Sequence, residues 1–74
     1  MSVKALDATG LKCPQPLLKM ALLAADMQRG DILEVTADCP TFEADVRAWC
    51  TRLKKTLLTV KQEGGYRKTV QIRF

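Results

Sequence analysis

Apolar residues recur along this chain at two different spacings, one typical of strands and one typical of helices. The order in which these two kinds of segment follow each other limits the folds that the chain can adopt. Some runs alternate between polar and apolar side chains, which is the period of a strand, and others place apolar side chains at helical spacing. The pattern predicts strands at 3–7, 32–37, 56–62 and 69–74, and helices at 14–26 and from Pro40 onward.

The resulting order is strand, helix, strand, helix, strand, strand, in a chain of 74 residues. Such a chain is too short for more than one thin core. We therefore expect residues 1–74 to form a single α+β domain, a two-layer βαβαββ sandwich with two helices on one face of a four-stranded sheet. The first strand–helix–strand unit should be parallel and right-handed. Gly64-Gly65 predicts a two-residue hairpin that makes the last two strands antiparallel.

We expect one side of each helix to fill the core. In the first helix the apolar residues predicted to cover that side are Leu17, Leu18, Met20, Ala21, Leu22, Ala24 and Ala25. In the second helix Cys50 lies beside Trp49 on a predicted apolar stripe that consists of Phe42, Val46, Trp49, Cys50 and Leu53. Cys50 is therefore predicted to be a core residue, and the two aromatic side chains to pack inside rather than to form a stacking surface.

The composition excludes several classes of function. The chain has no His and three Cys without a CxxC pair, which argues against a zinc site and removes the commonest general base. The odd number of cysteines and the lack of a secretory segment after Met1 argue against a disulfide framework and favour the cytoplasm. No apolar run approaches the roughly 20 residues of a membrane span. We expect no metal, no cofactor and no membrane binding, while a net charge of +4 favours an acidic partner.

Cys13 is the strongest candidate for chemistry. If Pro14 is the first helical residue, Cys13 occupies the N-cap, where free N–H groups and the helix dipole favour a thiolate. Lys12 and Lys19 would add positive potential nearby. The alternative is that Cys13 is a small buried apolar residue, as lone cysteines commonly are. The residues by themselves leave both interpretations open.

Cys39 repeats this local arrangement, because it also precedes a proline where a strand gives way to a helix. Asp38 before it opposes a thiolate and could itself cap the helix. In a parallel strand–helix–strand unit both connections leave the same edge of the sheet, and neighbouring strands are about 4.8 Å apart. The two cysteines could therefore come within reach of each other. Cys39 is either a capping variant or a second thiol that shares the chemistry of Cys13.

The segment from Leu6 to Pro16 resembles a known family signature. Its residues Leu6-Asp7-Ala8-Thr9-Gly10-Leu11-Lys12-Cys13-Pro14-Gln15-Pro16 match the LDxxGLxCPxP pattern of the TusA/SirA-like sulfur carriers, and the similarity extends over nearly the whole chain. The resemblance implies a mixed sheet with strand order 1-2-4-3. It also implies that Cys13 carries sulfur as a persulfide. The residues it assigns to the shape of the loop are Asp7, Gly10, Leu11, Pro14 and Pro16.

The resemblance also implies partners. A cysteine desulfurase or a rhodanese-type protein would supply the sulfur, and a downstream protein would accept it for tRNA thiolation, molybdenum-cofactor enzymes or sulfur oxidation. The chain would be a carrier rather than a stand-alone multi-turnover enzyme, and a monomer when free. Lys12 and Lys19 are candidates for docking a partner. Cys39 departs from the pattern, because many relatives have an acidic residue there, and this raises a redox or resolving role.

Two other functions are consistent with the residues. The first is a small basic RNA-binding module, suggested by the net charge, by Arg52-Leu53-Lys54-Lys55 and by a fold analogy to the C-terminal domain of bacterial translation initiation factor three. With few aromatic side chains to stack on bases, nucleic acid is not the partner we expect. The second is a dithiol redox protein that uses Cys13 and Cys39.

Overall fold

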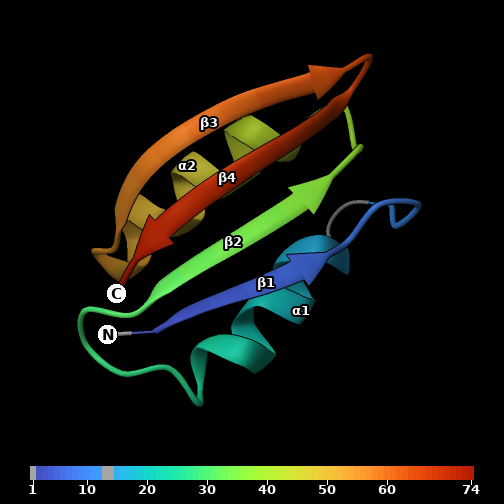
Figure 1. The fold of residues 1–74 in the computed structure, drawn as a ribbon. Helices are drawn as coiled ribbons and strands as arrows, with labels where there is room; N and C mark the ends of the chain where they lie inside the picture. The colour runs from blue at the N-terminus through green and yellow to red at the C-terminus, as the bar shows by residue number, and fades with distance from the viewer. Residues whose placement is uncertain (1, 13–14) are drawn as a thin grey trace.

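The computed structural model describes residues 2–12 and 15–74. Two helices alternate with the first three strands, and the fourth strand follows the third directly (Figure 1). The elements are β1 (Val3–Asp7), α1 (Gln15–Ala24), β2 (Ile32–Ala37), α2 (Phe42–Leu53), β3 (Thr56–Gly64) and β4 (Arg67–Arg73).

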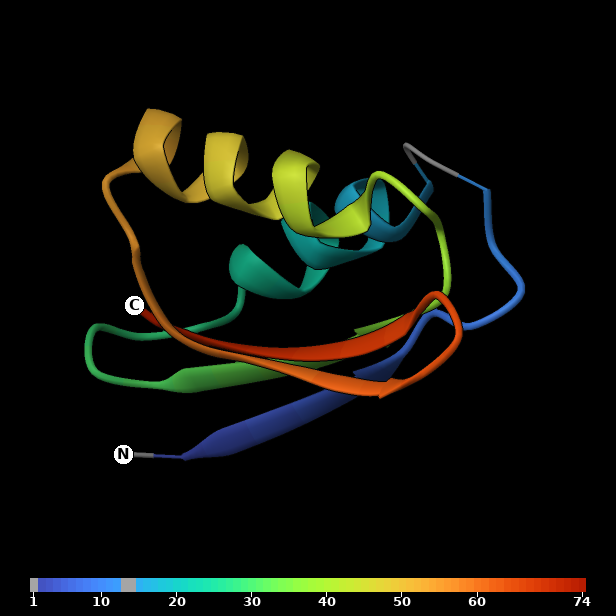
Figure 2. The same cartoon turned by 90° about the horizontal axis from the view of Figure 1, so that it is seen from above.

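The strands form one sheet in the order β1-β2-β4-β3. β1 runs parallel to β2, whereas β4 runs antiparallel to both of its neighbours, β2 and β3. Both helices lie on the same face of the sheet (Figure 2). The predicted two-layer α+β sandwich is confirmed, and so is the strand order that the family resemblance implied.

The core lies between the helices and the two central strands. In β2 every second side chain is buried, namely Leu33, Val35 and Ala37, as expected for a strand with one covered face. They pack with Met20 of α1 and with buried residues of α2 and β4. The core residues from those two elements are Phe42, Val46, Trp49, Cys50, Val70 and Ile72. Four of the five predicted core positions on the second helix are among them. Leu53, the fifth, is 44% exposed, because it lies in the last turn of α2, so the prediction for this residue is wrong.

Both helices differ from the prediction at their ends. α1 stops at Ala24 rather than at residue 26, because the chain turns there and the Met27 N–H donates to the Ala24 carbonyl at 3.1 Å. α2 starts at Phe42 rather than at Pro40, and Thr41 occupies the N-cap position. Pro40 instead lies in a turn closed by the Phe42 N–H, which donates to the Cys39 carbonyl at 3.0 Å.

The hairpin turn lies one residue later than predicted. Gly64 still pairs with Arg67, so the turn residues are Gly65 and Tyr66. A register shift between Gln62 and Gly64 adds one residue to β3, and Gly64 accommodates it with a φ of 124°. Both strands of the hairpin therefore reach further toward the turn than the alternation of side chains indicates.

α1 is only partly turned toward the core. Pro16 and Met20 are buried, but Leu18 is 60% exposed and Leu22 is 74% exposed. The prediction that these two leucines face inward is wrong. A helix that is apolar nearly all round can bury only one stripe in a two-layer fold, so the remaining apolar side chains face outward.

We predict a structural role for Cys50, which is 4% exposed and whose thiol pKa is raised by burial. Cys50→Ala should lower the free energy of unfolding by about 1 kcal/mol, because it removes one buried atom from a packed core. Denaturant unfolding followed by Trp49 fluorescence measures the change. Cys50→Ser should lower the free energy of unfolding further, because it buries a hydroxyl group. An unchanged midpoint for Cys50→Ala would show that the sulfur adds nothing to the packing.

Candidate functional site

Two loops meet at the edge of the sheet where β1 and β2 end. The last pair of the parallel ladder joins Asp7 and Thr36, and the Ala8 N–H then donates to the Thr36 carbonyl at 2.7 Å. Beyond this point the Gly10 N–H donates to Asp38 Oδ1 at 3.0 Å. Parallel pairing thus brings the two loops to one edge, as the sequence predicts (Figure 1), and a hydrogen bond joins them there.

Asp7 fixes the start of the first loop. Its Oδ1 atom accepts hydrogen bonds from the Thr9 hydroxyl at 2.6 Å and from the Thr9 N–H at 3.0 Å. These bonds, the hydroxyl first, lower the pKa of the Asp7 carboxyl below its ordinary value. A carboxylate that bonds the backbone two residues ahead closes a local turn. Asp7 therefore gives the chain a defined direction as it leaves β1.

Gly10 is the next fixed point of the loop, and its backbone has a conformation that residues with a Cβ atom adopt only at a cost in free energy. Its φ is 82°, although a Cβ atom at this position would meet nothing within 4 Å. The glycine is needed for its conformation, since a left-handed φ costs roughly 1–2 kcal/mol in residues with a Cβ. Leu11 follows, half-buried against the core, and its N–H donates to the Ala8 carbonyl at 3.3 Å.

The chain is held on both sides of the predicted nucleophile. The Gln15 N–H donates to the Lys12 carbonyl at 2.8 Å, and Pro16 is fully buried in the first turn of α1. The predictions for Cys13 as the reactive thiol and for Pro14 as the first helical residue concern positions outside the described residues. Of the other loop residues that the resemblance names, Asp7, Gly10, Leu11 and Pro16 all lie in or beside this loop.

The second loop differs from its prediction at the cap of α2. Asp38 does not cap the helix, because its carboxylate accepts the Gly10 N–H of the first loop. Cys39 is not the N-cap either, since Thr41 occupies that position. Cys39 is half-buried, and its Sγ atom lies 3.4 Å from Thr41 Oγ1. The bond from Gly10 to Asp38 spans 28 residues, and no local pattern in the sequence could have revealed it.

A hollow of about 340 Å³ lies between the two loops. It is lined by Gly10, Leu11, Lys12, Asp38, Cys39 and Pro40. The structure therefore brings the second candidate thiol, Cys39, to the residues that directly precede Cys13 in the sequence. Lys12, a predicted docking residue, lies in the same hollow and is exposed.

A second hollow, of about 270 Å³, extends from the first loop onto α1. Its lining includes Leu11, Leu18 and Lys19, so the other predicted docking cation also lies near the loop. Leu18 was predicted to face the core, but it is exposed and forms part of this surface. The signal that could have identified it is the apolar composition of α1 on all sides, which exceeds what one helix can bury in this fold.

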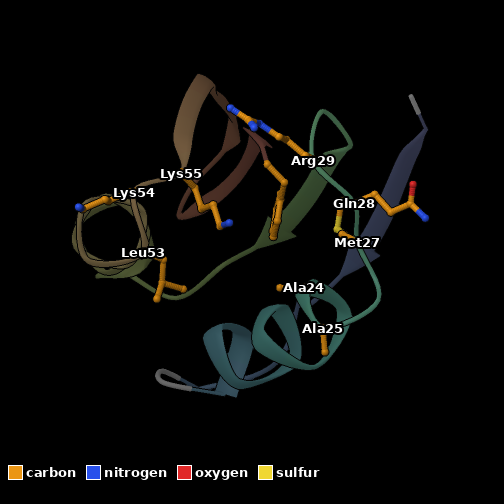
Figure 3. A pocket seen from close by; sticks show the side chains of 9 residues that line it. Ala24, Ala25, Met27, Gln28, Arg29, Leu53, Lys54 and Lys55 are labelled. Carbon is orange, nitrogen blue, oxygen red and sulfur yellow. The ribbon is translucent and has the colours of Figure 1, made fainter.

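A larger hollow, of about 630 Å³, lies at the opposite end of the molecule, where both helices end. Arg29, Lys54 and Lys55 contribute to its lining (Figure 3). The Lys55 ammonium group lies 5.0 Å from the centre of the Phe74 ring, whereas the Lys54 side chain points away from the other lining residues. These cations are remote from the two loops and add no positive charge to them.

Residues 2–12 and 15–74 contain no group of three or more metal-ligating side chains close enough to hold an ion. Within the same residues, neither helix is long and apolar enough to cross a membrane.

Comparison with known proteins assigns the family. The family model described as sulfurtransferase TusA matches residues 4–73. The chain belongs to the TusA family. Two relatives from Neisseria meningitidis, of serogroups A and B, are described as "putative sulfur carrier protein" and are each 38% identical over 65 residues, which is 88% of both chains. A relative from Aquifex aeolicus with the same description is 34% identical over 62 residues, covering 84% of this chain and 32% of its own length.

Proposed function

We propose that this chain is a sulfur carrier that holds sulfane sulfur as a persulfide on Cys13. A donor persulfide, on a cysteine desulfurase or a rhodanese-type protein, meets the Cys13 thiolate. The thiolate attacks the outer sulfur, the donor's sulfur–sulfur bond breaks, and the donor leaves as a thiolate. Sulfane sulfur moves without net oxidation, and a downstream acceptor cysteine takes it by the same step in turn. The chain is then a relay rather than a stand-alone enzyme.

The observation that carries the proposal is the TusA family membership, and the described residues on either side of Cys13 support it. The residues on either side of Cys13 belong to a loop fixed by the Asp7 turn and to the first turn of α1. A cysteine just before a helix experiences the positive end of the helix dipole, which lowers the pKa of a thiol. Lys12 precedes it directly and adds a positive charge.

The accessibility of the site also supports a relay. The described residues that line the hollow beside the loop belong to two short loops, so a second protein can approach it. Exposed Leu18, which lines a hollow with Leu11 of the loop and with Lys19, gives an incoming partner apolar surface, and Leu22 is exposed one turn further along α1. A carrier needs such access, because its sulfur must be reached by the active cysteine of another protein.

RNA binding gains no support from the aromatic residues. Phe42 and Trp49 are buried, so they cannot stack on bases. Tyr66 is exposed, but it lies in the β3–β4 turn, at the other end of the sheet from the basic hollow around Lys55 (Figure 1).

Sulfur loading tests the proposed function. After incubation with a cysteine desulfurase and cysteine, the Cys13 peptide should gain the mass of one sulfur atom, because Cys13 is the thiol that the helix start activates. Intact-protein and peptide mass spectrometry measure the gain. Cys50→Ala should load like the wild type, since Cys50 is buried in the core. Equal loading of Cys13→Ser and the wild type would contradict the proposal.

A second test concerns docking. Lys19 lies near the loop and Lys54 at the far end of α2, and both are exposed. Exposed charges interact over about 8 Å at physiological salt, so only cations close to Cys13 should steer an acidic donor. Lys19→Glu should therefore slow sulfur acceptance from a donor protein more than Lys54→Glu, although both change the net charge equally. The difference should shrink as salt is added.

Loading from inorganic polysulfide is the control for this test, because a small donor needs no docking surface. It should proceed equally in both lysine variants. If Lys54→Glu were instead the slower variant with the protein donor, the partner would bind a different surface.

A further inference from the structure

We propose that Cys39 is the resolving thiol of the same site, which discharges the Cys13 persulfide as hydrogen sulfide when no acceptor protein removes it. The proposal rests on the proposed function, because it requires a persulfide on Cys13. It assigns to Cys39 a chemical role that the relay itself does not need.

The placement of the two loops is the first support. β1 and β2 are neighbouring parallel strands, and strands in a sheet are about 4.8 Å apart. The bond from the Gly10 N–H to Asp38 Oδ1, at 3.0 Å, keeps the loops together beyond the end of the strands. A disulfide requires Cα atoms about 4.4–6.8 Å apart, which is the scale of this spacing.

The shared hollow is the second support. Cys39 and Lys12 line the same space of about 340 Å³, and Cys13 follows Lys12 directly in the sequence.

Cys39 is also chemically suited to the role, in contrast to Cys50. Burial raises the pKa of the Cys50 thiol and keeps it protonated within the core. Cys39 is only half-buried and lies at the edge of the sheet, where the exposed Lys12 ammonium group shares its hollow. A sulfur atom that enters this hollow can therefore reach Cys39, whereas Cys50 lies inside the core.

The step balances without an external oxidant. The Cys39 thiolate attacks the inner sulfur of the Cys13 persulfide, a bond forms between the two cysteine sulfurs, and the bond to the outer sulfur breaks. The outer sulfur leaves as hydrosulfide and takes up a proton from water. The two cysteines are oxidised to a disulfide while the sulfane sulfur is reduced to sulfide. A cellular dithiol then reduces the disulfide and restores the carrier.

The consequence is a limited lifetime for the loaded state. A docked acceptor that covers the hollow takes the outer sulfur before Cys39 attacks, whereas an idle carrier discharges and is held as a disulfide. The pair Cys13 and Cys39 would thereby couple sulfur delivery to the supply of reductant.

The test follows hydrogen sulfide release from protein loaded with inorganic polysulfide and then freed of excess reagent. Loading on Cys13 is verified by peptide mass spectrometry in the wild type, Cys39→Ser and Cys50→Ala. Release per loaded molecule should be at least about tenfold slower in Cys39→Ser, because it loses an intramolecular attack. Wild type and Cys50→Ala should release alike and yield a Cys13–Cys39 disulfide peptide.

Asp38 variants test the positioning of the two loops. Asp38→Ala removes the acceptor of the Gly10 N–H, so discharge per loaded molecule should slow. Asp38→Asn should restore it, because the amide oxygen still accepts that bond. A general loss of structure would affect both variants and would appear in their unfolding midpoints. Equal discharge in all three proteins would show that this bond does not position Cys39.

The outcomes separate the two proposals. If the wild type and Cys39→Ser both load on Cys13 and release sulfide at the same rate, with no disulfide peptide, the resolving role is overturned and the carrier function stands. If no protein gains sulfur on Cys13, the carrier function itself is contradicted.

Discussion

The parallel pairing of β1 with β2 is the constraint on which the candidate site depends. It brings the ends of two strands to one edge of the sheet, so that the loops before α1 and α2 lie side by side. The Gly10–Asp38 hydrogen bond continues this pairing past the last residues of the strands. Residues of both loops line the hollow that contains Cys39. The chemistry proposed for the two cysteines is thus a consequence of strand direction.

The two helices contribute unequally to the core. α2 supplies the buried side chains Phe42, Val46 and Trp49, and β2 and β4 supply the opposite side of the core. α1 buries Met20 but leaves Leu18 and Leu22 exposed, and Leu18 lines a hollow together with Leu11 of the first loop. Exposed apolar area is a cost for an isolated small domain but an advantage where partners dock. The two helices therefore differ in how much of their apolar surface they bury, although both cover the same face of the sheet.

Much of the fold followed from the sequence, because its signals are local. The alternation at 3–7 and 32–37 predicted β1 and β2 with their observed bounds, and the order of elements gave the layers. Helix ends were less predictable: Pro40 suggested a helix start, but the chain makes one more turn and begins α2 at Phe42. The role of Asp38 was missed, because its partner lies on another loop and only the folded sheet brings them together.

The central claim is that the start of α1 makes Cys13 an activated thiolate at an open edge. The rate of Cys13 alkylation as a function of pH, measured by peptide mass spectrometry on folded and denatured protein, tests it most directly. The account predicts a midpoint well below that of the denatured chain, which should lie near the ordinary cysteine pKa of about 8.5. Equal midpoints in the two states, or slower alkylation of Cys13 in the folded protein at neutral pH, would contradict the account.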